Sequence, residues 1–144
     1  DGAAALIIAD EEAIKKHNLT PIAKIISAAS SGVQPSYMGI GPVTASQKVL
    51  KKSNISIDNI DVLEINEAFA AQVLACLREF GISDNDERVN PNGGAIALGH
   101  PLGMSGTRLV LTAAKELEIT NKKYALCTMC VGVGQGSAII LEKV

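Results

Sequence analysis

Apolar runs alternate with longer amphipathic stretches along this chain of 144 residues. Short continuous apolar runs are typical of buried strands, and amphipathic stretches are typical of helices. Strands that alternate with helices and end in a hairpin predict an α/β layered domain with a mixed, mostly parallel sheet. Five strands are predicted, at Ala3 to Ala9, Pro21 to Ser31, Asp61 to Ile65, Lys122 to Cys130 and Ser137 to Glu142.

Four helices are predicted between these strands. Asp10 is a preferred N-cap residue, Gly81 is a preferred stop signal, and Pro101 suits the start of a helix. The glycine-rich run Gly132 to Gly136 joins the last two strands in a hairpin. The predicted helices are Asp10 to His17, Val43 to Lys52, about Glu67 to Phe80, and about Leu102 to Leu117.

Two of these helices are apolar nearly all round. Only three residues between Ala68 and Phe80 are polar, and Arg108 is the only charged residue from Leu102 to Ala114. A helix of this kind must be covered on more than one side. Because one sheet covers a single face, we expect a second domain or subunit to cover the rest.

Composition narrows the class of protein without indicating a function. With 47% hydrophobic and 19% charged residues the chain has an ordinary globular composition, and its length fits one domain. A formal net charge of −2 predicts no nucleic-acid partner, and no apolar run approaches the roughly 20 residues of a membrane span. Three cysteines cannot form a disulfide framework, so we expect a cytoplasmic location.

His100 lies near the end of a glycine-rich, almost uncharged run from Asn92 to Gly103. The glycines permit a tight loop, and Pro101 favours a helix start directly after the histidine. The dipole of that helix disfavours the imidazolium and leaves a neutral ring suited to catalysis. A structural helix cap or a phosphate-binding loop stays open as an alternative, although the Gly-Lys-Ser/Thr of a P-loop does not follow.

Cys130 lies where an apolar strand meets the glycine hairpin, a position at which a side chain can face a cleft. Buried cysteine is more often a small hydrophobic residue, and that alternative stays open. The spacing of Cys127 and Cys130 argues against a disulfide, because residues three apart in a strand point to opposite faces. Zinc needs four ligands, and the remaining cysteine, Cys76, lies in a predicted buried helix. No metal site is therefore predicted.

Asn66 and Glu67 directly follow the buried strand Asp61 to Ile65. This pair suits the capping of the next helix, because Asn is a preferred cap and Glu suits a first turn. The functional alternative is ligand binding, since open α/β sheets bind ligands beyond the carboxyl ends of their strands.

Four segments form a pattern when they are taken together: Asn66 to Ala70, Asn92 to Pro101, Cys130 to Gly136, and Pro35 to Pro42. The first three resemble the C-terminal signatures of the thiolases, and the fourth resembles a loop near bound coenzyme A. The segments occur in family order, and the resemblance spans essentially the whole chain.

Thiolases cleave a 3-ketoacyl-CoA with coenzyme A or run the reverse Claisen condensation of two acyl-CoA molecules. The resemblance implies that His100 activates the nucleophilic cysteine and helps to form an oxyanion hole for the thioester enolate. It implies that Asn66 holds a water in that hole and that Cys130 is the acid/base at the α-carbon. Gly132 would add its backbone N–H to a second oxyanion hole. Such chemistry needs donors aimed at the enolate and a soft base whose pKa is lowered by its setting.

The resemblance also implies which residues bind the substrate. Phe69 and Met38 would line the acyl and pantetheine pocket, and Ala68 belongs to the same substrate-binding group. The coenzyme A thioester is then the substrate, and neither a cofactor nor a metal is implied.

One departure from the family pattern bears on how the chain would work. The acylated cysteine of thiolases and their loop domain lie in the N-terminal half, and neither is present here. By resemblance, residues 1–17 match the last strand and helix of that half, and residues 18–144 match the C-terminal domain of an enzyme with αβαβα layers. We therefore expect the C-terminal part of a short-chain acyltransferase (acetyl-CoA C-acetyltransferase) of fatty acid metabolism, inactive without its N-terminal half. The resemblance implies a tetramer or dimer for the whole enzyme.

Two other classes of function stay open at this point. A non-catalytic thiolase-like module could bind coenzyme A or a partner subunit. A redox protein could use Cys127 and Cys130, which would require a disulfide between them.

Overall fold

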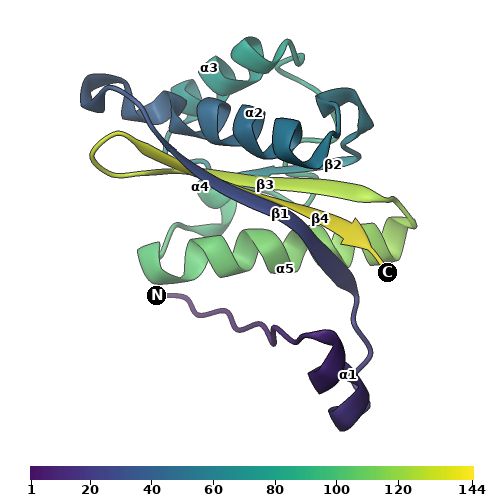
Figure 1. The fold of residues 1–144 in the computed structure, drawn as a ribbon. Coiled ribbons are helices and arrows are strands. Elements are labelled where there is room, and N and C mark those ends of the chain that lie inside the picture. The colour runs from purple at the N-terminus through teal and green to yellow at the C-terminus, as the bar shows by residue number, and fades with distance from the viewer.

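A four-stranded mixed sheet forms the centre of the structure, a computed structural model that describes all 144 residues (Figure 1). The strand order is β1-β4-β3-β2. β1 pairs with β4 and β3 pairs with β4 in antiparallel fashion, while β2 and β3 are parallel. The strands are β1 (Ala23–Gly32), β2 (Val62–Ile65), β3 (Tyr124–Val131) and β4 (Gln135–Lys143).

The α/β class is confirmed, but two predicted features of the sheet are wrong. The sheet has four strands rather than five, and only one of its three strand pairs is parallel. The hairpin between β3 and β4 forces an antiparallel pair, and β1 then adds antiparallel to β4. The predicted strand Ala3 to Ala9 has no strand partner, and an unpaired segment is not a strand. Its residues Ile7 and Ile8 are exposed, and the segment runs extended beneath α5 (Figure 1).

Helices cover both faces of the sheet (Figure 1). α2 (Gly41–Ser53) and α3 (Ala70–Phe80) lie on one face, and the long helix α5 (Leu102–Thr120) lies on the other. One group of buried apolar side chains fills the space under α2 and α3, and a second fills the space under α5. The short helical elements are α1 (Glu11–His17), η1 (Pro35–Ile40), η2 (Ile57–Asn59) and α4 (Ala95–Leu98).

The helix boundaries follow the capping signals in the sequence with one difference. Asp10 caps α1 by accepting a hydrogen bond from the backbone N–H of Ala13 at 2.8 Å, and Gly81 ends α3 with φ +71°. α3 begins at Ala70 rather than near Glu67. Phe69 is extended, and the side chains of the preceding polar pair are occupied elsewhere, as described below. The other four predicted strands and the remaining predicted helices match the structure to within a few residues.

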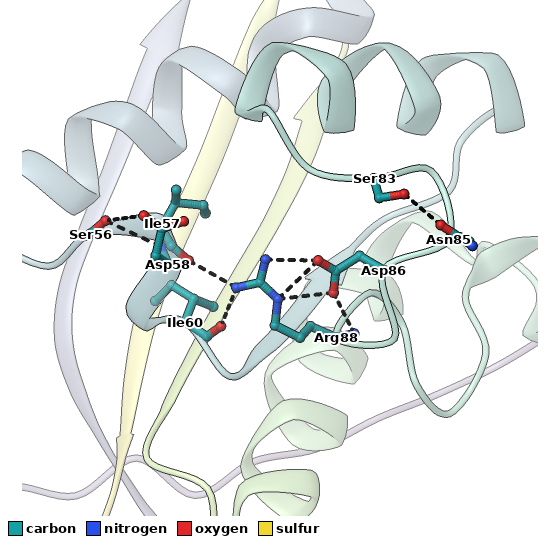
Figure 2. A network of polar contacts seen from close by, with 8 residues as sticks. All are labelled: Ser56, Ile57, Asp58, Ile60, Ser83, Asn85, Asp86 and Arg88. Carbon is teal, nitrogen blue, oxygen red and sulfur yellow. Dashed lines mark hydrogen bonds and ion pairs between the residues drawn. The ribbon is translucent and has the colours of Figure 1, made fainter.

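The outer edge of β2 is covered by a short irregular segment, residues 86–90. The backbone N–H of Leu63 donates to the carbonyl of Arg88, and the N–H of Asn90 donates back to the carbonyl of Leu63, each at 2.8 Å. The guanidinium of Arg88 holds both carboxylate oxygens of Asp86 and donates to the carbonyls of Ile57 and Ile60 (Figure 2). These bonds lower the pKa of Asp86. Figure 2 shows that Arg88 fastens this segment to the turn that precedes β2.

A buried ion pair joins β2 to α5. Nη1 of Arg108 donates to Oε2 of Glu64 at 3.0 Å, and the side chain of Glu64 is fully buried. Oε1 of Glu64 and two guanidinium nitrogens of Arg108 have no hydrogen-bond partner in the protein. Burial raises the pKa of Glu64 to about 7, although the charge of Arg108 opposes the rise.

This raised pKa predicts that the protein loses stability as the pH rises from about 4.5 to 7. Folded Glu64 keeps its proton to a higher pH than unfolded Glu64, so ionisation in this range favours unfolding. The loss is up to about 3 kcal/mol in the free energy of unfolding. Denaturant titrations at several pH values measure it. Glu64→Gln should flatten the slope, and an unchanged slope in that variant would contradict the assignment.

Two glycines allow the tip of the β3–β4 hairpin to pack directly on the start of α2. A Cβ added at Gly136 would collide with the carbonyl of Gly41, and a Cβ at Gly41 would collide with the carbonyl of Gln135. Gly136 is the cross-strand partner of Cys130. This backbone contact therefore fixes the strand pair that carries Cys130.

Gly136→Ala should destabilise the protein by about 2 to 3 kcal/mol, because the added methyl group meets backbone atoms that cannot turn away. Urea unfolding followed by circular dichroism measures the change. Gly103→Ala is the matched control: nothing lies within 4 Å of a Cβ at this position in α5. That change should be neutral or stabilise by up to about 1 kcal/mol. Equal effects of the two substitutions would refute the close-contact explanation.

Candidate active site

Asn66 and His100 meet although 34 positions separate them. Asn66 lies directly after β2, and His100 follows α4 and precedes α5. Nδ2 of Asn66 lies 3.3 Å from Nε2 of His100. The backbone N–H of Asn66 donates to the carbonyl of Thr128 on β3, which continues the parallel pairing past the end of β2. The sequence prediction that places His100 in a loop before a helix is confirmed.

The other side of the His100 ring contacts the first turns of α5. Nδ1 of His100 lies 2.6 Å from Oγ of Ser105, which also lies 3.1 Å from the carbonyl oxygen of Pro101. A serine hydroxyl can both accept and donate. The ring can therefore carry its proton on Nδ1, with Ser105 accepting, or on Nε2, with Ser105 donating and Asn66 turned to accept. A neutral His100 can act as a base in the first form and as a hydrogen-bond donor in the second.

Asn66 is fully buried, and its Oδ1 accepts no hydrogen bond from the protein. Most buried polar atoms have a hydrogen-bond partner, and a buried amide oxygen without one is costly. The contact with His100 and this free acceptor separate Asn66 from an ordinary helix cap. Its side chain caps no helix, since α3 begins four residues later.

Cys130 lies near the end of β3, two residues beyond Thr128 and half-buried. Because β2 and β3 are parallel, Asn66 and Cys130 lie at the same edge of the sheet. Burial raises the pKa of the Cys130 thiol. The sequence-based expectation of a lowered pKa at this cysteine is therefore wrong for this chain, since its surroundings remove solvent from the thiolate and no cation compensates.

The other two cysteines are structural in their environment. Cys127 points to the α5 face, where its thiol donates to the carbonyl of Leu109 at 3.6 Å, and Cys76 donates to the carbonyl of Gly39 at 3.3 Å. Burial raises the pKa of Cys76 to about 11 and that of Cys127 still further. All three cysteines are free, and Cys127 and Cys130 lie on opposite faces of β3 as predicted.

The residues expected to bind substrate lie near the start of α3. Phe69 precedes the helix and is 65% exposed, and Ala68 donates its backbone N–H to the carbonyl of Asn66. Met38 lies in η1 and is partly exposed. η1 is fastened to α3 through the carbonyl of Gly39, which accepts from Gln72 of that helix. Gly132 lies in the exposed hairpin turn after Cys130.

Ser105 and Asn90 were not singled out from the sequence, yet both hold the site together. Ser105 contacts the His100 ring, and Asn90 bonds to the backbone N–H and carbonyl of Ile65 at 2.8 and 2.9 Å. Asn90 has a positive φ of 45°. The run Asn90-Pro91-Asn92-Gly93 is a turn signal that could have indicated this conformation.

The comparisons with known proteins identify the family. The family model described as the C-terminal domain of thiolase matches residues 19–143. The chain belongs to the thiolase family. It spans only 36% of the length of its curated relatives and matches their C-terminal part. How residues 1–17 and 18–144 divide between the two halves of a thiolase stays a prediction.

Relatives within the thiolase family match over nearly the whole chain. The beta-ketoadipyl-CoA thiolase of Pseudomonas aeruginosa is 61% identical over 144 residues, 100% of this chain and 36% of the relative. The acetyl-CoA acetyltransferase of Syntrophomonas wolfei is 49% identical over 142 residues, 99% of this chain and 36% of the relative. The crystal structure of human mitochondrial 3-ketoacyl-CoA thiolase matches with a TM-score of 0.91 and 48% identity, covering 94% of this chain and 34% of that one.

None of the helices in this thiolase domain has the length and apolar composition needed to cross a membrane.

Alkylation of the native thiolase domain should modify Cys130 far faster than the other two cysteines. Cys130 is half-buried, whereas Cys76 and Cys127 are fully or almost fully buried. We expect a rate difference of about tenfold or more, because alkylation needs an accessible thiolate. Mass spectrometry after timed iodoacetamide treatment measures it, with denatured protein as the control. A Cys127–Cys130 disulfide after mild oxidation would instead support the redox function.

Proposed function

We propose that this chain is the C-terminal half of a thiolase that cleaves a 3-ketoacyl-CoA with coenzyme A or runs the reverse condensation of two acetyl-CoA molecules. The observation that carries the proposal is the contact between Asn66 and His100, two residues that the family pattern assigns to one oxyanion hole. A site without a catalytic role would not need to keep this pair together at the end of the sheet where Cys130 also lies.

Cleavage begins when Nε2 of His100 takes the proton of the nucleophilic cysteine of the N-terminal half. The resulting thiolate attacks the 3-keto carbon, and the bond between C2 and C3 breaks. The electron pair of that bond forms the enolate of acetyl-CoA. His100, with its proton on Nε2, donates to the enolate oxygen, and Asn66 supports that oxyanion hole. The thiol of Cys130 then protonates C2 and becomes a thiolate, which takes the proton from the thiol of a second coenzyme A. The coenzyme A thiolate attacks the acyl-enzyme, the bond between the acyl group and the nucleophilic cysteine breaks, and that cysteine regains its proton from His100.

Cys130 serves both directions of the reaction: its thiol protonates the enolate in cleavage, and its thiolate removes the α-proton in condensation. The names of the relatives favour degradation, since the beta-ketoadipyl-CoA thiolase reaches 61% identity against 49% for the acetyl-CoA acetyltransferase. We therefore propose 3-oxoadipyl-CoA as a better substrate than acetoacetyl-CoA.

The proposed function also implies which ligand the chain binds and which parts of the enzyme it assembles with. Coenzyme A is a substrate rather than a cofactor, and a related solved structure is a human mitochondrial 3-ketoacyl-CoA thiolase in complex with CoA. The N-terminal half would cover the outer side of α5 and the extended segment before α1, where Leu102, Ile7 and Ile8 are exposed. The complete enzyme would form a dimer or tetramer. The three free cysteines support action in a reducing compartment such as the cytoplasm.

A joined enzyme tests this proposal. This chain is fused behind the N-terminal part of the Pseudomonas aeruginosa beta-ketoadipyl-CoA thiolase, and the loss of 3-oxoadipyl-CoA or acetoacetyl-CoA is followed in the presence of coenzyme A. His100→Ala and Cys130→Ser should each lower kcat by about 10²-fold or more, because they remove an oxyanion donor and the proton donor.

The unmodified relative and His17→Ala are the controls, since His17 lies at the end of the exposed helix α1. Substrate loss with both site variants at the rate of the unmodified joined enzyme would contradict the assigned roles. Binding of coenzyme A without any cleavage would support the non-catalytic module instead.

A further inference from the structure

Glu67 bonds to two separate parts of the segment that leads to His100. Its Oε1 accepts from Nδ2 of Asn90 at 2.8 Å, and its Oε2 accepts from the backbone N–H of Ile96 at 3.0 Å. Ile96 lies in the first turn of α4, whose last residue is two positions before His100. Both carboxylate oxygens therefore bond to the segment that leads to His100.

The backbone at Gly94 is shaped to admit this carboxylate. A Cβ added at Gly94 would collide with all three atoms of the Glu67 carboxylate group. Gly94 has φ −104°, which other residues also adopt, so its glycine is required by the contact and not by the backbone conformation. The glycine loop and the glutamate are thus complementary in shape.

The Glu67 carboxylate is also linked to the outer side of β2, through the side chain of Asn90. Asn90 bonds to the backbone N–H and carbonyl of Ile65 as well as to Glu67. Ile65, Asn66 and Glu67 are consecutive, so this cluster fixes one end of the Asn66–His100 contact while Ile96 fixes the segment that carries the other end.

We propose that Glu67 is a positioning residue that sets the separation of Asn66 and His100 by holding Asn90 and the start of α4. This inference rests on the proposed thiolase function only for its consequence in catalysis. Glu67 takes no part in the bond-breaking and proton-transfer steps of the cleavage. Its effect passes through the geometry of the oxyanion hole, for which a misplacement of 1 Å can cost roughly 10²-fold in rate.

Glu67→Gln in the joined enzyme is the test. Glutamine has the shape of glutamate but presents an amide NH₂ to one of two positions that now offer only N–H donors. We expect kcat to fall about 10- to 100-fold while KM for the 3-ketoacyl-CoA changes by less than about threefold, because the oxyanion hole acts mainly in the transition state. Crystal structures of both forms should show the separation of Asn66 Nδ2 and His100 Nε2 lengthen from 3.3 Å beyond hydrogen-bond distance.

Glu116→Gln is the matched control. Glu116 lies on α5 and accepts from Nδ2 of Asn92 at 2.7 Å, so it is a second carboxylate bonded to the same loop at an exposed place. This variant should keep kcat within about twofold of the unmodified joined enzyme. An equal loss of activity in both variants would overturn the specific role of Glu67.

Gly94→Ala disturbs the contact between Gly94 and the Glu67 carboxylate from the side of the loop. It should lower kcat as Glu67→Gln does. In a Glu67→Ala background the added methyl group has no carboxylate to meet, so the two changes should be strongly non-additive. Unchanged kcat and unchanged Asn66–His100 separation in Glu67→Gln, or full additivity of the pair, would overturn the inference. A joined enzyme without any activity would contradict the proposed function, and the crystallographic separation would still decide the role of Glu67.

Discussion

The rest of the site depends on one constraint: the buried backbone N–H and C=O groups on the outer side of β2 must find hydrogen-bond partners. β2 is only four residues long, completely buried, and at the end of the sheet. Buried backbone groups must find partners. Residues 88–90 supply them at Leu63, and the side chain of Asn90 supplies them at Ile65. The segment that completes the strand edge is thus the same segment that leads into the glycine loop of His100.

The segment from Asp86 to His100 is held in place at both of its ends by separate contacts. Arg88 and Asp86 tie the beginning of the segment to the turn before β2 (Figure 2). The packing of α5 holds the far end, where Ser105 contacts His100. On the same helix Arg108 pairs with Glu64, which lies two residues before Asn66 on β2. Polar contacts between the β2 region and α5 therefore include both the ion pair and the contact of Ser105 with His100, and apolar packing lies beside them.

Local patterns in the sequence predicted much of this structure, and the failures have a common cause. Apolar runs placed β2, β3 and β4 correctly, because each pairs within the chain. The same kind of run at Ala3 to Ala9 is not a strand, since pairing depends on a partner that local sequence does not reveal. Family motifs pointed to Asn66 and His100, and the structure brings them together. The sequence suggests a first-turn or ligand-binding role for Glu67 and does not indicate its contacts, because its bonds to Asn90 and Ile96 join positions 23 and 29 residues away.

Under the proposed function this chain supplies an oxyanion hole and a proton donor, and the N-terminal part of the enzyme supplies the acylated nucleophile. The most direct measurement is a titration of this chain into the separately expressed N-terminal part of the Pseudomonas aeruginosa relative, with the rate of 3-ketoacyl-CoA cleavage as the readout. We expect no turnover by either part alone and a rate that rises until the two parts are equimolar. Turnover by the 144-residue chain alone would contradict the proposed function.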